Sequence, residues 1–196
     1  MRWLAGALFA LAGTGAEAAR FESLIVEHHA GVFTVRAVMV LAAPPAAVRA
    51  ALTDFAHLER LSPAILESRL LRETASGPLV FTRSKACVGW FCRDLRKTEL
   101  VEITADAIVA TALPEQSNVT SSVTRWQFAA DGDATRVVWE TAVDPAFFVP
   151  PLLGPPLVKA ALKREGQTLA IGLERTAQEL AREPPAAPPE RRVPDG

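Results

Sequence analysis

The chain has 196 residues, of which 49% are hydrophobic and 22% are charged, and its formal net charge is −1 at pH 7. This length suits one substantial domain and is too short for two ordinary ones. A net charge of −1 gives no indication of the clustered basic surface that nucleic-acid binding requires, so we expect no nucleic-acid partner.

The N-terminus has the pattern of a secretory signal peptide. A basic start and an apolar run over residues 3–11 precede Ala16-Glu17-Ala18, which places small residues at both positions that a signal peptidase inspects. The run is shorter than the roughly 20 residues of a membrane-spanning helix. A buried N-terminal helix or a membrane anchor is the alternative. We expect residues 1–18 to be removed and the mature protein to be periplasmic or secreted.

The next part of the chain combines strands with short helices. Residues 22–27 are a short candidate strand, and residues 32–41 (VFTVRAVMVL) predict a stronger one because they are rich in β-branched side chains. Pro44-Pro45 ends that strand and begins a helix over residues 46–53, since proline is favoured in a first turn. Asp54 is expected to cap a second short helix that runs through Leu61.

From residue 65 onward the pattern becomes one of strands joined by tight turns. Short connections such as Asp131-Gly132-Asp133 carry strong turn signals and favour an antiparallel meander. The predicted strands cover residues 65–74, 79–88, 91–103, 107–113, 119–129 and 135–143.

Two cysteines flank one of these turns. If Gly89-Trp90 are the central pair of a type II′ hairpin turn, Cys87 lies directly opposite Cys92 in a non-hydrogen-bonded pair. Alpha carbons in such a pair approach closely enough for a disulfide, and an oxidising compartment lets it form. Free thiols or half of a metal site are the alternatives. The sequence has no second Cys or His cluster, so we expect a disulfide and no metal.

A Pro-rich apolar segment and a long helix complete the chain. Residues 144–156 (DPAFFVPPLLGPP) read as neither a helix nor a central strand. Residues 157–182 have apolar side chains near the helical period, whereas charged residues such as Glu165 and Glu174 are expected to be mostly available to solvent. The Pro-rich tail over residues 183–196 is expected to be disordered, which leaves residues 19–182 as the domain.

The order of these elements resembles the START/Bet-v-1-like (SRPBCC) superfamily and its polyketide cyclase/dehydrase and lipid-transport group. The likeness is carried by residues 41–48 (LAAPPAAV), by residues 52–63 (LTDFAHLERLSP) and by residues 66–71 (LESRLL), and it covers residues 32–180. It implies an α+β helix-grip fold, in which a curved antiparallel sheet of about six or seven strands wraps on a long C-terminal helix, with two short helices after the first strand. It also implies a cavity for lipids, sterols, quinones or polyketides. No catalytic residue carries over, because the superfamily has no universal catalytic motif.

Large apolar side chains near the expected cavity are candidate walls or lid. Ordinary core packing is the alternative for each of them, because a cavity and a core use the same residue types. The candidates are Phe81, Trp126, Phe128, Trp139, Phe147, Phe148, Leu162, Leu169 and Leu173.

Two of these candidates and two arginines carry more specific hypotheses. Phe147 and Phe148 form an entrance lid or a transient membrane contact, or else pack under the helix. Arg83 and Arg96 oppose each other across the hairpin, which is unfavourable unless they are solvated or bind an anion. They hold a polar headgroup in one interpretation and lie on a solvated outer face in the other.

The function that these features favour is an exported carrier for a hydrophobic small molecule, with no cofactor. The sequence lacks a Ser-His-Asp order, an HExxH motif, a phosphate-binding loop and a dinucleotide-binding fingerprint. A cyclase/aromatase-like enzyme and a ligand-free protein-interaction module are the alternatives, and the sequence indicates no particular protein partner.

Overall fold

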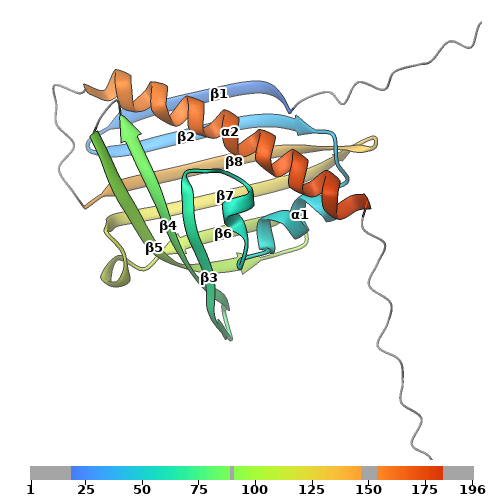
Figure 1. Cartoon of the computed structure of the whole chain (residues 1–196), viewed down its shortest axis with the longest axis horizontal. Coiled ribbons are helices and arrows are strands. Elements are labelled where there is room, and N and C mark those ends of the chain that lie inside the picture. The colour runs from blue at the N-terminus through green and yellow to red at the C-terminus, as the bar shows by residue number, and fades with distance from the viewer. Residues whose placement is uncertain (1–18, 89–90, 147–153, 183–196) are drawn as a thin grey trace, which may run out of the picture.

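A computed structural model describes residues 19–88, 91–146 and 154–182 (Figure 1). The described residues form one antiparallel sheet, two α-helices and two short 3-10 turns. The elements are β1 (Arg20–His29), β2 (Val32–Leu41), α1 (Pro45–Thr53), η1 (Leu58–Arg60), β3 (Ile65–Thr74), β4 (Gly77–Val88), β5 (Phe91–Ile103), β6 (Ala107–Ala112), η2 (Pro114–Gln116), β7 (Val119–Asp131), β8 (Ala134–Pro145) and α2 (Gly154–Arg182).

The eight strands form an open sheet in the order β1-β2-β8-β7-β6-β5-β4-β3. Strands β3 to β8 follow one another as neighbours, as expected from their short connections. Strand β2, from the beginning of the chain, pairs with β8, the last strand, and so joins the β1–β2 hairpin to the rest of the sheet. Figure 1 shows α2 lying along one face of this sheet, with α1 and η1 on the same side. The architecture is the expected α+β helix-grip fold, with eight strands where about six or seven were predicted.

The core lies between the sheet and the two helices. Alternate residues of β2 are buried from Phe33 to Leu41, because strand side chains point to opposite faces in turn. On the helix side, Val48 of α1 and Leu173 of α2 are completely buried. The sheet therefore buries one face and leaves most of the other to solvent.

Several predicted element ends shift in the structure. The expected short strand over residues 22–27 is the longer β1, since its pairing with β2 continues in both directions. Asp54 ends α1 and does not cap a following helix, and only the 3-10 turn η1 forms before Leu61. The long helix begins at Gly154, with Pro155 and Pro156 in its first turn, where their missing N–H groups cost no hydrogen bond.

The hairpin register agrees with the prediction. Cys87 pairs with Cys92 and Arg83 with Arg96, and a disulfide joins the two sulfur atoms. The alpha carbons of the two cysteines are 4.1 Å apart. The predicted turn residues, Gly89-Trp90, lie outside the described residues, so the turn type stays a prediction.

Helix α2 is anchored to the loops by two close contacts. The position of Gly172 leaves no space for a side chain, since a Cβ there would lie 2.0 Å from the carbonyl oxygen of Leu61. Glu174 is 6% exposed, and its Oε2 accepts a 2.8 Å hydrogen bond from the backbone N–H of Ala42. The prediction that Glu174 faces solvent is therefore wrong, because this carboxylate serves as the partner of a backbone donor in the β2–α1 loop.

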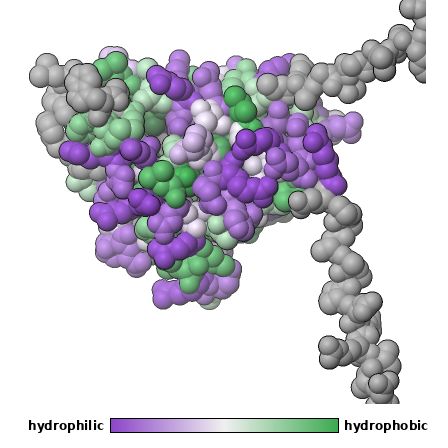
Figure 2. Space-filling model, in the orientation of Figure 1, coloured by the Kyte–Doolittle hydropathy of each residue, from purple (hydrophilic) through white to green (hydrophobic). Residues whose placement is uncertain are grey.

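Exposed hydrophobic side chains form scattered patches. Figure 2 shows hydrophilic side chains predominating over the C-terminal part of α2, with separate hydrophobic patches elsewhere on this face. Leu66, Leu70 and Leu71 of β3 are 42–45% exposed. Strand β3 is an edge of the sheet, and it carries two register irregularities that disfavour pairing with another strand.

Candidate ligand-binding cavity

A cavity of about 650 Å³ lies between the inner face of the sheet and α2. Its volume is within the range of about 300–1,000 Å³ that is typical of small-molecule sites. Most of its wall is aliphatic or aromatic. The apolar wall includes Val80, Val101 and Ile108 from the sheet, Leu162 and Leu169 from α2, and Leu58 and Leu61 from the loop that contains η1.

Two tryptophans form the aromatic part of the wall. Trp126 of β7 lies directly opposite Trp139 of β8, and their rings stack with centroids 5.2 Å apart and planes 8° from parallel. Both residues are 8% exposed. The ring of Trp139 also lies against α2, where a Cβ at Gly166 would come within 3.1 Å of it. The absence of a side chain at Gly166 lets the helix approach this wall closely.

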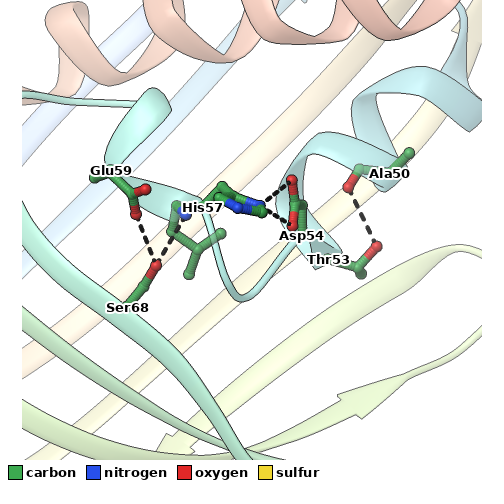
Figure 3. Close-up of polar contacts among 7 residues, drawn as sticks. Ala50, Thr53, Asp54, His57, Glu59 and Ser68 are labelled. Carbon is green, nitrogen blue, oxygen red and sulfur yellow. Dashed lines mark hydrogen bonds and ion pairs between the residues drawn. The ribbon is translucent and has the colours of Figure 1, made fainter.

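The connection between α1 and β3 closes one side of the cavity. Figure 3 shows the polar contacts that fix it: His57 Nδ1 lies 2.9 Å from Asp54 Oδ1, and Ser68 Oγ donates to Glu59 Oε2 at 3.1 Å. The backbone N–H of Leu58 donates to Ser68 Oγ at 2.9 Å. These bonds hold the loop against β3, and Leu58 is thereby positioned in the cavity wall.

A small group of polar side chains interrupts the apolar wall. Lys97 Nζ lies 2.6 Å from Glu99 Oε1, and both residues belong to the inner face of β5. Thr82 lies opposite Lys97 in the register, with its Oγ1 3.5 Å from Glu99 Oε2. Across the cavity, Glu165 of α2 accepts a hydrogen bond from Ser62 Oγ. The cavity thus combines extensive apolar surface with a few hydrogen-bonding groups.

The structure brings four of the nine predicted apolar site residues to the cavity: Trp126, Trp139, Leu162 and Leu169. The three remaining described candidates lie elsewhere. Leu173 is completely buried in the core, and Phe128 packs against the core with the Arg49 guanidinium 5.5 Å from its ring centroid. Phe81 lies on the opposite face of the sheet, where the guanidinium of Arg69 covers its ring at 5.0 Å.

Phe147 and Phe148 lie outside the described residues, so their assignment to a lid or a membrane contact stays a prediction. Arg83 and Arg96 are both described and neither lines the cavity. Arg83 makes ion pairs with Glu67 at 3.3 Å and with Asp94 at 3.5 Å. The repulsion between Arg83 and Arg96 across the hairpin is therefore reduced by the two carboxylates that pair with Arg83.

Sequence analysis did not identify Lys97 and Glu99 as cavity residues. A signal for them existed in the hairpin register, because the pairing of Cys87 with Cys92 also places Thr82 opposite Lys97 and Val80 opposite Glu99. The same alternation puts both charged residues on the face of apolar Val80. Charged side chains are rarely buried unless they are paired, so a composition-based assignment gives such positions to solvent.

Other classes of site find no support in the described part of the chain. Residues 19–88, 91–146 and 154–182 contain no group of three or more His, Cys, Asp and Glu side chains placed to hold a metal ion. Within these same ranges, no helix combines the length and apolar character needed to cross a membrane.

Comparison with known families gives a match over most of the chain. The sequence profile of the family described as "Polyketide cyclase / dehydrase and lipid transport" matches residues 32–181. No curated protein matches the chain.

Solved structures share the fold at low sequence identity. A START superfamily protein from Mycobacterium smegmatis is 20% identical, with a TM-score of 0.60 over 75% of this chain and 98% of that one. A STAR-related lipid transfer protein from Xanthomonas axonopodis is 19% identical, with a TM-score of 0.55 over 77% and 97% of the two chains. The ZhuI aromatase/cyclase from Streptomyces sp. R1128 is 15% identical, with a TM-score of 0.54 over 76% and 93%.

Proposed function

The chain belongs to the polyketide cyclase/dehydrase and lipid-transport family, and from this premise we propose that it is an exported carrier for a hydrophobic small molecule. One observation carries the proposal: the cavity of about 650 Å³ between the sheet and α2 has a wall made largely of aliphatic and aromatic side chains. A lipid, a quinone or a sterol-like molecule has the size and the apolar surface that suit such a space. An open cavity also favours a carrier over a ligand-free interaction module, in which side chains would fill this volume.

Export is supported by two features. The predicted cleavage after Ala18 falls just before β1, which begins at Arg20, so removal of residues 1–18 would leave the sheet intact. The disulfide between Cys87 and Cys92 is of the kind that persists in oxidising compartments.

The direct test is native mass spectrometry of the protein purified from the periplasm or the culture medium of the cells that make it. We expect a mass that corresponds to a chain beginning at Ala19, together with one co-purified lipophilic molecule, which organic extraction then identifies. A protein that carries nothing and takes up nothing from a mixture of lipids and quinones would contradict the carrier proposal.

A cavity-filling variant provides the matched control. Ala110 lines the cavity, so Ala110→Phe is expected to occupy ligand space and reduce the stoichiometry of the bound lipid severalfold. Ala129→Phe makes the same change at an exposed position of β7 and is expected to leave binding unchanged. Equal loss in both variants would show that the effect comes from folding and not from occupation of the cavity.

A cyclase-type enzyme is the second candidate. It is favoured by the Lys97–Glu99 pair, because an ammonium and a carboxylate on the wall of a largely apolar cavity are groups that can take part in general acid–base chemistry. Prolonged incubation of the identified ligand with catalytic amounts of protein distinguishes the two. A carrier returns the ligand unchanged, whereas a cyclase yields more product molecules than there are protein molecules.

Uptake from a bilayer requires contact between the protein and a membrane. On the sequence pattern alone, we propose that Phe147 and Phe148 make this contact, since large apolar side chains in a Pro-rich segment suit a lipid surface. The Phe147→Ser, Phe148→Ser variant is expected to float with liposomes less than the unmodified protein does. Equal flotation would show that these side chains do not mediate the contact.

A further inference from the structure

The Lys97–Glu99 pair differs from the other ion pairs of the fold in its burial. Its two side chains are 14% and 8% exposed. Within the described ranges, both side chains of every other ion pair are at least 34% exposed. A buried pair loses the hydration of two charges, and apolar side chains of similar volume often serve stability equally well or better. A contribution to the stability of the sheet therefore does not explain why Lys97 and Glu99 occupy these positions.

The surroundings of the pair point to the cavity. Leu95 and Val101 flank it on the same face of β5, and both are cavity-lining residues with apolar side chains. Thr82, the nearest polar neighbour, adds a hydroxyl on the adjacent strand. The three polar side chains form one patch on an apolar wall, and a ligand that fills the cavity lies against them.

The charge of the patch restricts the ligand. The ammonium of Lys97 and the carboxylate of Glu99 neutralise each other at 2.6 Å, so the patch has no net charge. An ammonium has three N–H donors, and a carboxylate has several acceptor positions, so both groups keep hydrogen-bonding capacity beyond their mutual bond. A ligand hydroxyl can accept from Lys97 and donate to Glu99, and a ketone oxygen can accept from Lys97.

We infer that the ligand carries a neutral oxygen-bearing group, a hydroxyl or a ketone, which binds against Lys97 and Glu99. This inference rests on the proposed carrier function. A carboxylate, a phosphate or an ammonium at the same place would add an uncompensated charge to a poorly solvated wall, and such a charge is strongly disfavoured. The remaining charged lining residues are Lys85 and Arg164, which are exposed, and Glu165, which is held by Ser62.

The test is a displacement assay with four probes that share one hydrocarbon chain. The full mature protein is loaded with the neutral fluorophore N-phenyl-1-naphthylamine and titrated with hexadecane, 1-hexadecanol, hexadecanoate and hexadecylamine. We expect 1-hexadecanol to displace the fluorophore at a concentration about tenfold lower than each of the others, which is the effect of one net hydrogen bond or one avoided charge. Hexadecanoate binding as tightly as the alcohol would overturn the inference.

Single substitutions that leave one charge of the pair unpartnered should make the cavity prefer a probe of the opposite charge. Lys97→Met leaves the carboxylate of Glu99 alone, so hexadecylamine is expected to gain about tenfold relative to the alcohol. Glu99→Gln leaves the ammonium of Lys97 alone, and hexadecanoate is expected to gain by a similar factor. Unchanged preferences in both variants would place the ligand's polar group elsewhere, such as at the exposed Lys85 or Arg164.

Two further variants keep the test informative if a single variant folds poorly. The double variant Lys97→Met, Glu99→Met contains no unpaired charge. It is expected to fold and to bind hexadecane as tightly as it binds 1-hexadecanol. Arg36→Met, Glu140→Gln removes an exposed pair of 3.3 Å and is expected to change no preference. If the fluorophore never binds, the carrier proposal itself fails. If it binds and all four probes displace it equally, only the present inference fails.

Discussion

Replacement of Gly172 by alanine tests whether α2 docks on the loops as closely as the structure shows. The added Cβ would lie 2.0 Å from the carbonyl oxygen of Leu61 and 2.7 Å from its carbonyl carbon, both backbone atoms that no rotamer change can move. Overpacking of this kind costs about 3 kcal/mol, and the better helix propensity of alanine returns about 1 kcal/mol. The expected net loss is therefore about 2 kcal/mol in the free energy of unfolding.

The assay is urea denaturation followed by circular dichroism, with a thermal melt as a second readout. A loss of about 2 kcal/mol corresponds to a melting temperature lowered by about 4–8 °C for a domain of this size. Gly166→Ala is the matched control, because it gains the same helix propensity while the three atoms nearest its Cβ belong to the side chains of Trp139 and Leu24, at 3.1–3.7 Å, and not to the backbone. We expect that variant to lie within about 0.5 kcal/mol of the parent protein. Equal stability of the two variants would refute the close approach of α2 to Leu61.

Two further changes test individual contacts. Glu174→Ala removes the buried carboxylate that accepts the part-buried hydrogen bond from the Ala42 N–H, and it is expected to cost about 1–3 kcal/mol in urea denaturation. Glu179→Ala, which breaks an exposed pair on the same helix, should cost less than about 1 kcal/mol. A smaller loss for Glu174 than for Glu179 would show that the Ala42 contact does not form. Substitution of Cys87 and Cys92 by serine is expected to lower stability by about 2 kcal/mol, because their sequence separation is only 5 and the closed loop is short. Reductant should then destabilise the parent protein alone, and an equal response of the variant would contradict this account.

The candidate site shows why strand prediction does not by itself locate a cavity. Trp126, Trp139, Leu162 and Leu169 were identified because a cavity wall is apolar, and the cavity contains all four. Phe81 met the same criterion but belongs to the opposite face of the sheet, under Arg69. Lys97 does not meet this criterion because it is charged. Its ion pair with Glu99, two residues away, nevertheless lets it lie in the cavity wall. Composition therefore found part of the apolar wall and missed its polar patch.

The sequence by itself determined the strands, the hairpin register and the long helix. These features follow from local causes: the alternation of residues 32–41, the stop at Pro44 and the spacing between Cys87 and Cys92 act over a few residues. Tertiary structure alone decided which face of each strand is covered, because alternation defines two faces and the docking of α2 selects one. The burial of Glu174 and the enclosure of Lys97 follow from that selection, since each lies between segments far apart in the sequence.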